Sequence, residues 1–489
     1  MRVKFLLCFF TMLGFLVMGY HPGIEDDGVY LSAVKSDLNP ALYPHNADFF
    51  RLEMKATHFD TWMADFVRVT HIPLATSALL WQVAAIFAIL FATWSIARQL
   101  FSDEAAQWGA VAMVSAMLTL PVSGTAIYIL DQHLHPRSLA TALLLLAVSS
   151  LLARKRWQAV PLVLLAIAFH PIMGVLGAFF CVALEITLMQ PASAAIPEPE
   201  LAETAATFGV IPFGWLLAKP SGIWLDALRS RHWFRLYSWT WYEWLGALGP
   251  LAIFWCIARL GKNRPDNTLS RFAAATVGYG TLFLVLSLIV LSPRLPSGVG
   301  TLEPMRFLHL IYIFLAMMIG ALLGKRVLRN RLWRWALFLI VVNGGMFAAQ
   351  RQLFASTEHL ELPGRSTSNS WLQAFAWIRA NTPVDAYFAL DPKYMADPGE
   401  DYHSFRALAE RSALSDAIKD ASVVTKVPDL GPVWEAQQAA QQGWNHFRLA
   451  DFERLHSEFG VNWVLVSNPA PIGLDCPWHN DALTVCRIP

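Results

Sequence analysis

Long apolar stretches separated by short polar connections dominate the first 350 residues. After the N-terminal stretch MRVKFLLCFFTMLGFLVMGY, further apolar segments lie at about residues 72–97, 108–130, 138–152, 158–169, 172–188, 205–217, 244–257, 272–291, 307–323 and 333–350. Several are shorter than the roughly 20 residues that a straight span needs, but short helices are tolerated where protein or a water-filled cavity surrounds them. The pattern predicts a polytopic α-helical membrane protein with about 11 transmembrane helices.

The basic residues of the connections predict the orientation of these spans. Arg2 and Lys4 precede the first apolar stretch and no small-x-small cleavage site precedes His21, so we expect an uncleaved first helix with a cytoplasmic N-terminus. Residues 190–203 are an exception, because this predicted inner loop is acidic and rich in proline. The other predicted inner loops hold most of the basic residues of the membrane region: Arg98, Arg154, Lys155, Arg156, Arg259, Lys262, Arg264, Arg271, Lys325, Arg326, Arg329, Arg331 and Arg334.

Residues 47–70 follow a different pattern from the predicted spans. Their apolar positions recur at steps of three, four and seven, with charged residues between them: Phe49, Phe50, Leu52, Phe59, Met63, Phe66 and Val67. This spacing is typical of a helix that lies in the membrane surface. We therefore expect one surface helix within a first outer loop, residues 21–71, beside the acids discussed below.

The chain changes character after residue 350. SWLQAFAWIRANTP is predicted to be a helix closed by Pro383, and ADFERLHSEFG a helix that ends at Gly460. AYFAL, VNWVLVS and LTVCRI have the composition of strands. These patterns divide the chain into a multi-spanning membrane domain, residues 1–350, and a small soluble α/β domain outside the cytoplasm, residues 351–489.

The composition is that of a membrane protein and argues against a nucleic-acid partner. Of the 489 residues, 55% are hydrophobic and only 15% charged, against about a quarter charged in ordinary soluble domains; the mean hydropathy is +0.42. A net charge of +1 without a long basic run predicts no nucleic-acid partner. None of the five cysteines forms a CxxC pair. Cys476 and Cys486 are predicted either to form a disulfide outside the cytoplasm or to remain free.

The first outer loop opens with HPGIEDDGVY, residues 21–30, which places Glu25, Asp26 and Asp27 at the mouth of a membrane helix. Carboxylates beside a bilayer are costly unless they bind a cation or take part in chemistry. A solvated acidic loop is the alternative. Further ionisable residues gather at the outer ends of other predicted helices, which favours a site: Asp131, His133, His135, Arg137, His170, Arg235, Glu303 and Arg306.

This layout resembles the GT-C superfamily of membrane glycosyltransferases, which includes protein mannosyltransferases and aminoarabinose transferases. The matching residues are Asp26, Asp27 and Tyr30, set against the family's Asp-Glu pair and following tyrosine, and Asp131, set against the acid of its second outer loop. The resemblance covers the membrane part well and the tail only in general layout. It implies that a sugar passes from a polyprenyl-phosphate carrier to a glycan, lipid or protein acceptor on the outer face.

Such a reaction accounts for the residue types. Attack by an acceptor hydroxyl needs a base, or a divalent ion held by carboxylates, which Asp26 is expected to supply with Asp27 or Asp131. A Mg²⁺ or Mn²⁺ ion would be held by Asp26, Asp131 and His135. The departing lipid phosphate needs a cation, for which Arg306 is expected, with Arg137 or Arg235 as substitutes and Tyr30 as a further substrate-binding residue.

Each of these roles has a structural alternative. Asp27 would merely cap or solvate the loop, and Asp131 would pair with Arg137 at a helix end. His133, His135 and His170 would be turn residues rather than metal ligands. The tryptophans of residues 219–244 are more typical of a membrane-interface belt than of a sugar platform.

Two other functions stay open at the level of sequence. One is a lipid or glycan transporter or flippase, which predicts charges within the spans and related half-sequences; the other is a noncatalytic scaffold with the same fold. The chain has no Asn-x-Ser/Thr acceptor with x other than proline, which favours a bacterial inner membrane over the endoplasmic reticulum.

Overall fold

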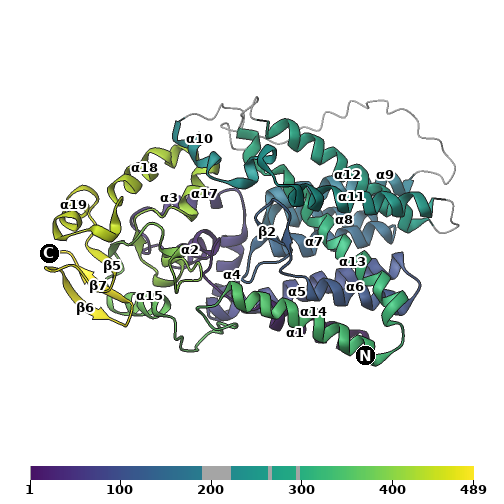
Figure 1. Ribbon diagram of the computed structural model, residues 1–489, viewed down its shortest axis with the longest axis horizontal. Coiled ribbons are helices and arrows are strands. Elements are labelled where there is room, and N and C mark those ends of the chain that lie inside the picture. Colours follow the sequence, from purple (N-terminus) through teal and green to yellow (C-terminus); the bar gives the residue numbers. More distant parts are fainter. Residues whose placement is uncertain (1, 190–221, 263–266, 293–297) are drawn as a thin grey trace.

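The computed structural model describes residues 2–189, 222–262, 267–292 and 298–489. It has two parts along its longest axis (Figure 1). A bundle of long helices holds the N-terminus at its far end, and a smaller mixed α/β region holds the C-terminus at the opposite end.

Within the described ranges, six segments are long and apolar enough to cross a membrane, which makes the chain an integral membrane protein by the length and composition of its helices. Not all 11 predicted crossings are confirmed, and the predicted segment at 205–217 lies outside the described residues. The first helix, α1 (Arg2–Met18), and the apolar helices α7 (Pro136–Leu152) and α8 (Arg156–Phe169) are shorter. The six candidates are α5 (Leu74–Leu100), α9 (Pro171–Met189), α11 (Trp241–Gly261), α12 (Thr268–Val290), the segment Gly298–Leu328 with α13 (Leu308–Leu323), and α14 (Leu332–Leu353).

Glycines let α6 (Glu104–Ala116) and α13 approach each other closely. A Cβ atom on Gly109 would lie 2.2 Å from the carbonyl oxygen of Gly320, and one on Gly320 would lie 2.3 Å from the carbonyl oxygen of Gly109. Small residues at such contacts are the usual device for helix packing in membranes, where apolar burial alone gives little preference for protein over lipid. This contact packs α6, from the N-terminal part of the bundle, against α13, which lies about 200 residues later in the chain.

The predicted span at 108–130 is wrong in its second half. Helix α6 ends at Ala116, and the chain then forms a short hairpin of β1 (Pro121–Val122) and β2 (Ile127–Tyr128). Pro121 cannot continue the helical hydrogen bonding, and Gly124 adopts a positive φ of 64° that suits a turn. The apolar run therefore folds back inside the protein.

The predicted surface helix at 47–70 is divided in two. The structure has α3 (Asp48–Met54) and α4 (Phe59–Thr70), with a break between them. At the break, the hydroxyl of Thr57 donates to the carbonyl oxygen of Phe169 at 2.7 Å, and the N–H of His58 donates to Ala168 at 3.0 Å. These bonds to the end of α8 replace those that a continuous helix would make.

The C-terminal region contains a five-stranded sheet with the order β4-β3-β5-β7-β6. Strand β3 pairs in parallel with β4 and with the central strand β5, whereas β7 is antiparallel to both β5 and β6. Cys476 of β6 and Cys486 of β7 form a disulfide. The predicted helices and strands of this region are all present: α15 (Ser370–Asn381), α19 (Leu449–Phe459), β3 (Tyr387–Ala389), β5 (Trp463–Ser467) and β7 (Leu483–Arg487). Not predicted were β4 (Ser412–Ala413) and β6 (Asp475–His479).

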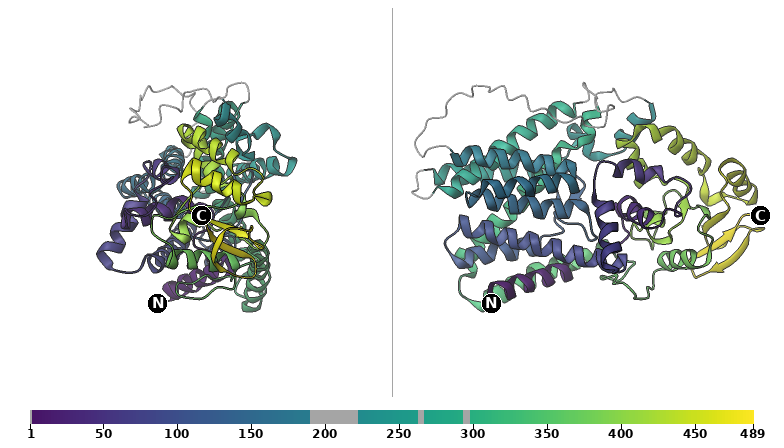
Figure 2. Two further views of the ribbon diagram at one scale, coloured as in Figure 1. Left: turned by 90° about the vertical axis from the view of Figure 1, so that its left-hand side faces the viewer. Right: turned by 180° about the vertical axis from the view of Figure 1, so that it is seen from behind.

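The first outer loop lies between the helix bundle and the C-terminal region, as the view from behind shows (Figure 2, right). Backbone bonds join it to the C-terminal region: the N–H of Glu25 donates to Tyr402 at 2.9 Å, and the N–H of Ser404 donates to Gly23 at 2.7 Å. Beside them, the carboxylate of Glu361 lies between two buried histidines, 2.7 Å from Nδ1 of His21 and 3.1 Å from Nε2 of His403. These contacts hold the start of the loop against the C-terminal region.

Candidate active site

Asp26 lies at the start of helix α2 (Asp27–Leu38), where the chain turns from the first helix into the loop. One carboxylate oxygen, Oδ2, lies 3.3 Å from Nε2 of His135, and the other, Oδ1, lies 3.2 Å from Nζ of Lys419. The Asp26 side chain is 38% exposed, whereas that of His135 is almost fully buried. Asp26 is therefore both held by neighbours and reachable from outside.

The environment of His135 fixes which of its nitrogens carries the proton. Its Nδ1 accepts the backbone N–H of Arg137 at 2.9 Å, so the neutral ring has its proton on Nε2 and donates it to Asp26. Burial and the nearby Arg137 lower the pKa of His135 to about 4. Burial works against the charge on Asp26, but Lys419 and His135 outweigh it and hold the pKa of this carboxyl well below its usual range. Asp26 is an ionised carboxylate beside a neutral imidazole.

Asp27 faces a different environment from its neighbour. Its side chain is buried and accepts the backbone N–H of Gly23 at 2.7 Å, and burial raises its pKa. It lines a cavity of about 380 Å³ on another side of α2, together with Lys35, which pairs with Glu410 at 2.7 Å. The two consecutive acids thus point into separate surroundings.

Asp131 is paired with Arg137, the alternative that the sequence left open. Nη2 of Arg137 lies 2.6 and 2.7 Å from the two carboxylate oxygens, and both side chains are buried. Nε and Nη1 of Arg137 have no hydrogen-bond partner among the described residues. The guanidinium therefore retains two donor nitrogens for a ligand.

The predicted metal set of Asp26, Asp131 and His135 does not come together as ligands. Asp131 is taken by Arg137, Nδ1 of His135 is taken by the backbone, and Asp26 is already paired with an ammonium group. In the described ranges, no group of three or more histidine, cysteine or acidic residues is arranged to hold a metal ion. The residues at Asp26 therefore do not fit a divalent cation.

An apolar groove of about 470 Å³ lies beside this site, between α9 and α12. Ile172, Val175 and Phe179 line its apolar length, and its polar end holds Tyr30, Glu53, His170 and Lys426. The ring of Tyr30 packs edge-on against His135 with the centroids 4.7 Å apart, and the rings of His135 and His170 stack at 5.8 Å. Tyr30 and the two histidines thus connect the head of the groove to Asp26.

Cations from two parts of the chain lie at the head of the groove. Nζ of Lys426 is 2.5 Å from Oε1 of Glu53, and Arg306 pairs with Glu303 beside the groove residue Pro304. The charges of Arg306 and Glu303 act on Lys426, which places the two pairs near each other. Arg306, which the sequence predicted, therefore lies at this end of the groove.

Arg235 does not join this cluster. Its side chain is exposed, and none of the described contacts connects it to Asp26 or the groove. Arg231 of the same tryptophan-rich segment is the arginine that reaches inward: its Nη2 donates to the carbonyl oxygen of Ile418, next to Lys419, at 2.5 Å. The choice of Arg235 as a binding residue is not supported by this arrangement.

Sequence reasoning missed Lys419 and Lys426, the first and last residues of α17 (Lys419–Lys426). Seven residues is about two helical turns, so both lysines share one face of the helix. The spacing of the two lysines in KDASVVTK therefore indicated, from the sequence alone, that they share a helix face. Nothing local indicated that the face meets Asp26 and Glu53, more than 370 residues earlier.

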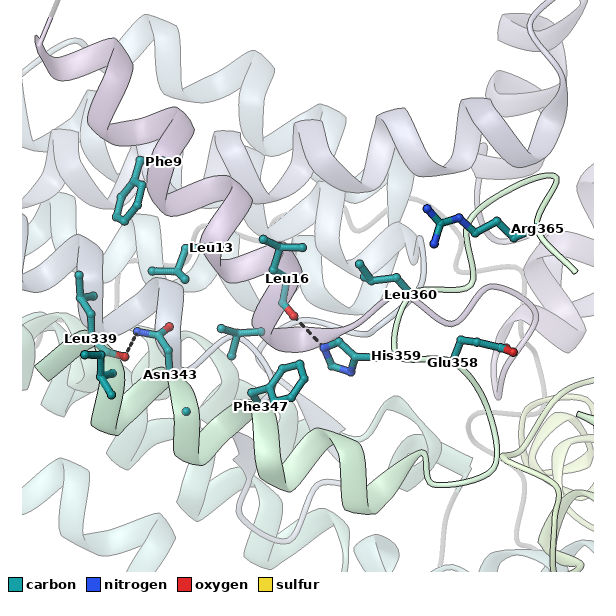
Figure 3. A pocket seen from close by; sticks show the side chains of 13 residues that line it. Phe9, Leu13, Leu16, Leu339, Asn343, Phe347, Glu358, His359, Leu360 and Arg365 are labelled. Carbon is teal, nitrogen blue, oxygen red and sulfur yellow. Dashed lines mark hydrogen bonds between the residues drawn. The ribbon is translucent and has the colours of Figure 1, made fainter. Parts of the chain in front are cut away.

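A wider groove of about 640 Å³ lies elsewhere, between α1 and α14 (Figure 3). Its walls carry apolar side chains such as Phe9, Leu13 and Phe347, and Glu358 and Arg365 lie at one end. His359, also at this end, binds the carbonyl oxygen of Leu16 at 2.7 Å through Nε2. Because its lining includes neither Tyr30 and His170, which contact His135, nor Lys426, this groove is not the candidate site.

No protein-family model matches the chain, and no curated protein sequence matches it. Among solved structures, the chain is similar to an oligosaccharyltransferase from Archaeoglobus fulgidus, crystallised in complex with Zn and sulfate, with a TM-score of 0.42, 11% identity, and coverage of 94% of this chain and 68% of that one. It is also similar to the oligosaccharyltransferase AglB of the same organism, in complex with an inhibitory peptide and a dolichol-phosphate, with a TM-score of 0.23, 12% identity, and coverage of 94% and 57%. At these TM-scores the likeness does not assign the chain to a family.

Proposed function

We propose that the protein is a GT-C-type glycosyltransferase that moves a sugar from a polyprenyl-phosphate carrier to an acceptor hydroxyl on the outer face of the membrane. The observation that carries the proposal is the position of Asp26. An ionised, partly exposed carboxylate lies behind the polar end of an apolar groove; His135 contacts both this carboxylate and Tyr30, which lines the groove. The sequence resemblance built on Asp26, Asp27, Tyr30 and Asp131 supports the same reaction.

The groove suits the donor lipid. Apolar side chains of α9 and α12 line its length, as a polyprenyl chain requires, and two ion pairs, Lys426 with Glu53 and Arg306 with Glu303, lie at its polar end. A phosphate at this end would take charge-assisted hydrogen bonds from these cations and from the free N–H groups of Arg137. Lys426 and Arg306 each have an acidic partner, so a bound phosphate would have to displace Glu53 or Glu303.

The proposed step is a substitution at the anomeric carbon. The acceptor hydroxyl oxygen forms a bond to this carbon while the bond to the phosphate oxygen breaks, and the electron pair leaves with the lipid phosphate. Asp26 accepts the hydroxyl proton, and His135 holds the carboxylate in place. A weakly basic carboxylate is adequate where the anomeric carbon carries most of the developing charge. The acceptor is a glycan, a lipid or a protein.

The proposed setting is a bacterial inner membrane with the N-terminus in the cytoplasm. Residues 1–350 form the membrane domain, and residues 351–489 form a periplasmic domain; the disulfide between Cys476 and Cys486 suits such a compartment. A transporter or flippase is the second candidate. The ionisable residues of the bundle lie near the ends of its helices rather than along them, which favours the enzyme.

The test is sugar transfer in membranes that contain the protein, with radiolabelled polyprenyl-phosphate sugars as donors. Wild type is expected to transfer label, and Asp26→Asn, at equal expression and folding, is expected to lose transfer. Full activity of Asp26→Asn would contradict the role of Asp26. Absence of transfer from every donor by well-folded wild type would favour the transporter or the noncatalytic scaffold.

A further inference from the structure

The cation beside Asp26 comes from the C-terminal region. Nζ of Lys419 lies 3.2 Å from Oδ1 of Asp26 and 3.4 Å from Oε2 of Glu25, and the lysine side chain is only 16% exposed. Lys419 begins α17, and its backbone N–H donates to Oδ1 of Asp416 at 2.5 Å. The ammonium group is therefore delivered by an anchored helix end and not by a free surface chain.

Helix α17 has neighbours from the membrane part on both sides. It packs against α3 and against α10 (Gly222–Arg229), where Nε1 of Trp224 donates to the carbonyl oxygen of Thr425 at 3.0 Å. At its far end, Lys426 pairs with Glu53 of α3. These contacts fix the position of Lys419 relative to Asp26, although the two residues are 393 positions apart in the chain.

Lys419 occupies Oδ1 of Asp26, the carboxylate oxygen that His135 leaves free for a divalent ion. Such an ion would lie against an ammonium group, and the like charges repel at this distance. It would also lack further ligands, because Asp131 binds Arg137 and His135 has only one nitrogen directed at Asp26. The ammonium group of Lys419 and the lack of further ligands both argue against a divalent ion at Asp26.

We propose that Lys419 replaces a divalent metal ion at Asp26, so that sugar transfer needs no metal and depends on a cation supplied by the C-terminal region. This inference rests on the proposed function. Lys419 acts through Asp26: it orients the carboxylate toward the acceptor hydroxyl and compensates the combined negative charge of Asp26 and Glu25. It is a positioning residue, and the bonds that form and break at the anomeric carbon are unchanged.

The experiment uses the full-length protein in lipid vesicles with a labelled polyprenyl-phosphate sugar. It compares wild type, Lys419→Ala, Lys419→Arg and the control Lys393→Ala, which removes an exposed lysine of the same region. Each is assayed after exhaustive chelation, with Mg²⁺ or Mn²⁺ added back, and with ethylammonium. The thermal unfolding temperature of each variant is recorded in parallel.

Wild type and Lys393→Ala are expected to keep their transfer rate after chelation. Lys419→Ala is expected to lose about 10²-fold in kcat, with little change in donor KM, and to regain part of the rate with ethylammonium, which restores a cation without repairing the fold. Lys419→Arg is expected to keep partial activity.

The inference is overturned if chelation abolishes wild-type transfer and a divalent metal restores it, or if Lys419→Ala is fully active. It is also overturned if Lys419→Ala loses activity together with thermal stability and ethylammonium has no effect. In these cases the proposed function stands, because wild type still transfers sugar under some condition. If wild type transfers no sugar under any condition, both the proposed function and the inference about Lys419 are contradicted.

Discussion

Nε2 of His135 donates to Oδ2 of Asp26 across 3.3 Å, while Nδ1 of the same ring accepts the N–H of Arg137. The backbone at the start of α7 thus determines which oxygen of Asp26 is occupied and leaves the other to Lys419. The neighbouring acid, Asp27, has no share in this arrangement and binds the N–H of Gly23 instead. Two consecutive carboxylates are therefore expected to behave differently when each is replaced.

Asp26→Asn is expected to reduce the transfer rate by about 10²- to 10⁴-fold, because an amide cannot accept the hydroxyl proton. Asp27→Asn is expected to stay within a few-fold of wild type, since its amide oxygen can still accept the N–H of Gly23. Initial rates at saturating donor measure both. If Asp27→Asn were the inactive variant and Asp26→Asn the active one, the assignment of the catalytic carboxylate would be reversed.

Filling the groove is expected to weaken donor binding. Val175→Trp places a large side chain in the apolar groove, so the KM for a long-chain polyprenyl-phosphate sugar should rise more than that for a short-chain donor. Val182→Trp is the matched control, because Val182 lies on the same helix and is 57% exposed toward the outside. Equal effects of the two substitutions on the KM would mean that the lipid does not use this groove.

The pair of Asp131 and Arg137 is expected to matter first for stability. Asp131→Ala leaves a buried guanidinium without its partner, which typically costs about 3–5 kcal/mol of unfolding free energy. The double variant Asp131→Leu/Arg137→Met removes both charges and should recover most of this loss. Thermal unfolding in detergent measures the effect. A double variant less stable than Asp131→Ala would speak against a simple buried pair.

The junction between the first outer loop and the C-terminal region is expected to depend on pH. Burial opposes charge on His403, but Glu361 and Glu400 outweigh it and raise its pKa from 6.5 to about 10. Burial likewise opposes charge on Glu361, but His403 and His21 lower its pKa from 4.5 to about 2. The stabilisation by His403 is complete below pH 6.5 and is lost toward pH 10; that by Glu361 is complete above pH 4.5 and is lost toward pH 2.

Thermal stability should therefore be greatest between pH 4.5 and 6.5 as far as this junction is concerned. His403→Gln should lower the stability in acidic buffer and flatten its decline in alkaline buffer. His446→Gln removes an exposed histidine of the same region and should leave the profile unchanged. An alkaline decline that persists in His403→Gln would assign the effect to another group.

The contact between α6 and α13 supplies a test of the bundle. Gly320→Leu is expected to force the helices apart, because even a Cβ at this position would lie 2.3 Å from the carbonyl oxygen of Gly109. Gly344→Leu on α14 is the matched control, since nothing lies within 4 Å of its added Cβ. Unfolding temperatures in detergent compare the two. Similar values would contradict the close packing of α6 and α13.

Local patterns determine where several helices of the bundle lie, which is why the sequence predicts those helices closely. Helix α9 begins and ends within one residue of the apolar segment at 172–188, and α12 within a few residues of that at 272–291. Asp131 and Arg137 are six residues apart, so their pairing was visible as an alternative. In each case the information lies within a short stretch of chain.

Distant contacts decide the features that the sequence did not reveal. The surface helix is broken where Thr57 bonds Phe169, 112 residues away, in preference to its own helix. Lys419 and Lys426 look like ordinary surface lysines until α17 is placed against the first outer loop. Hydrophobic periodicity is a property of a single helix or strand. Contacts such as those of Thr57, Lys419 and Lys426 depend instead on where two helices meet.

The long separation between Asp26 and Lys419 also sets the order in which the molecule is built. Synthesis begins at the N-terminus, so the first outer loop is made long before α17. Likewise, His21 is made long before its partner Glu361, which follows it by 340 residues. A ribosome-bound or truncated chain can insert its helices but carries lone acids at their outer ends. The proposed active site is therefore completed only after α17 has been made.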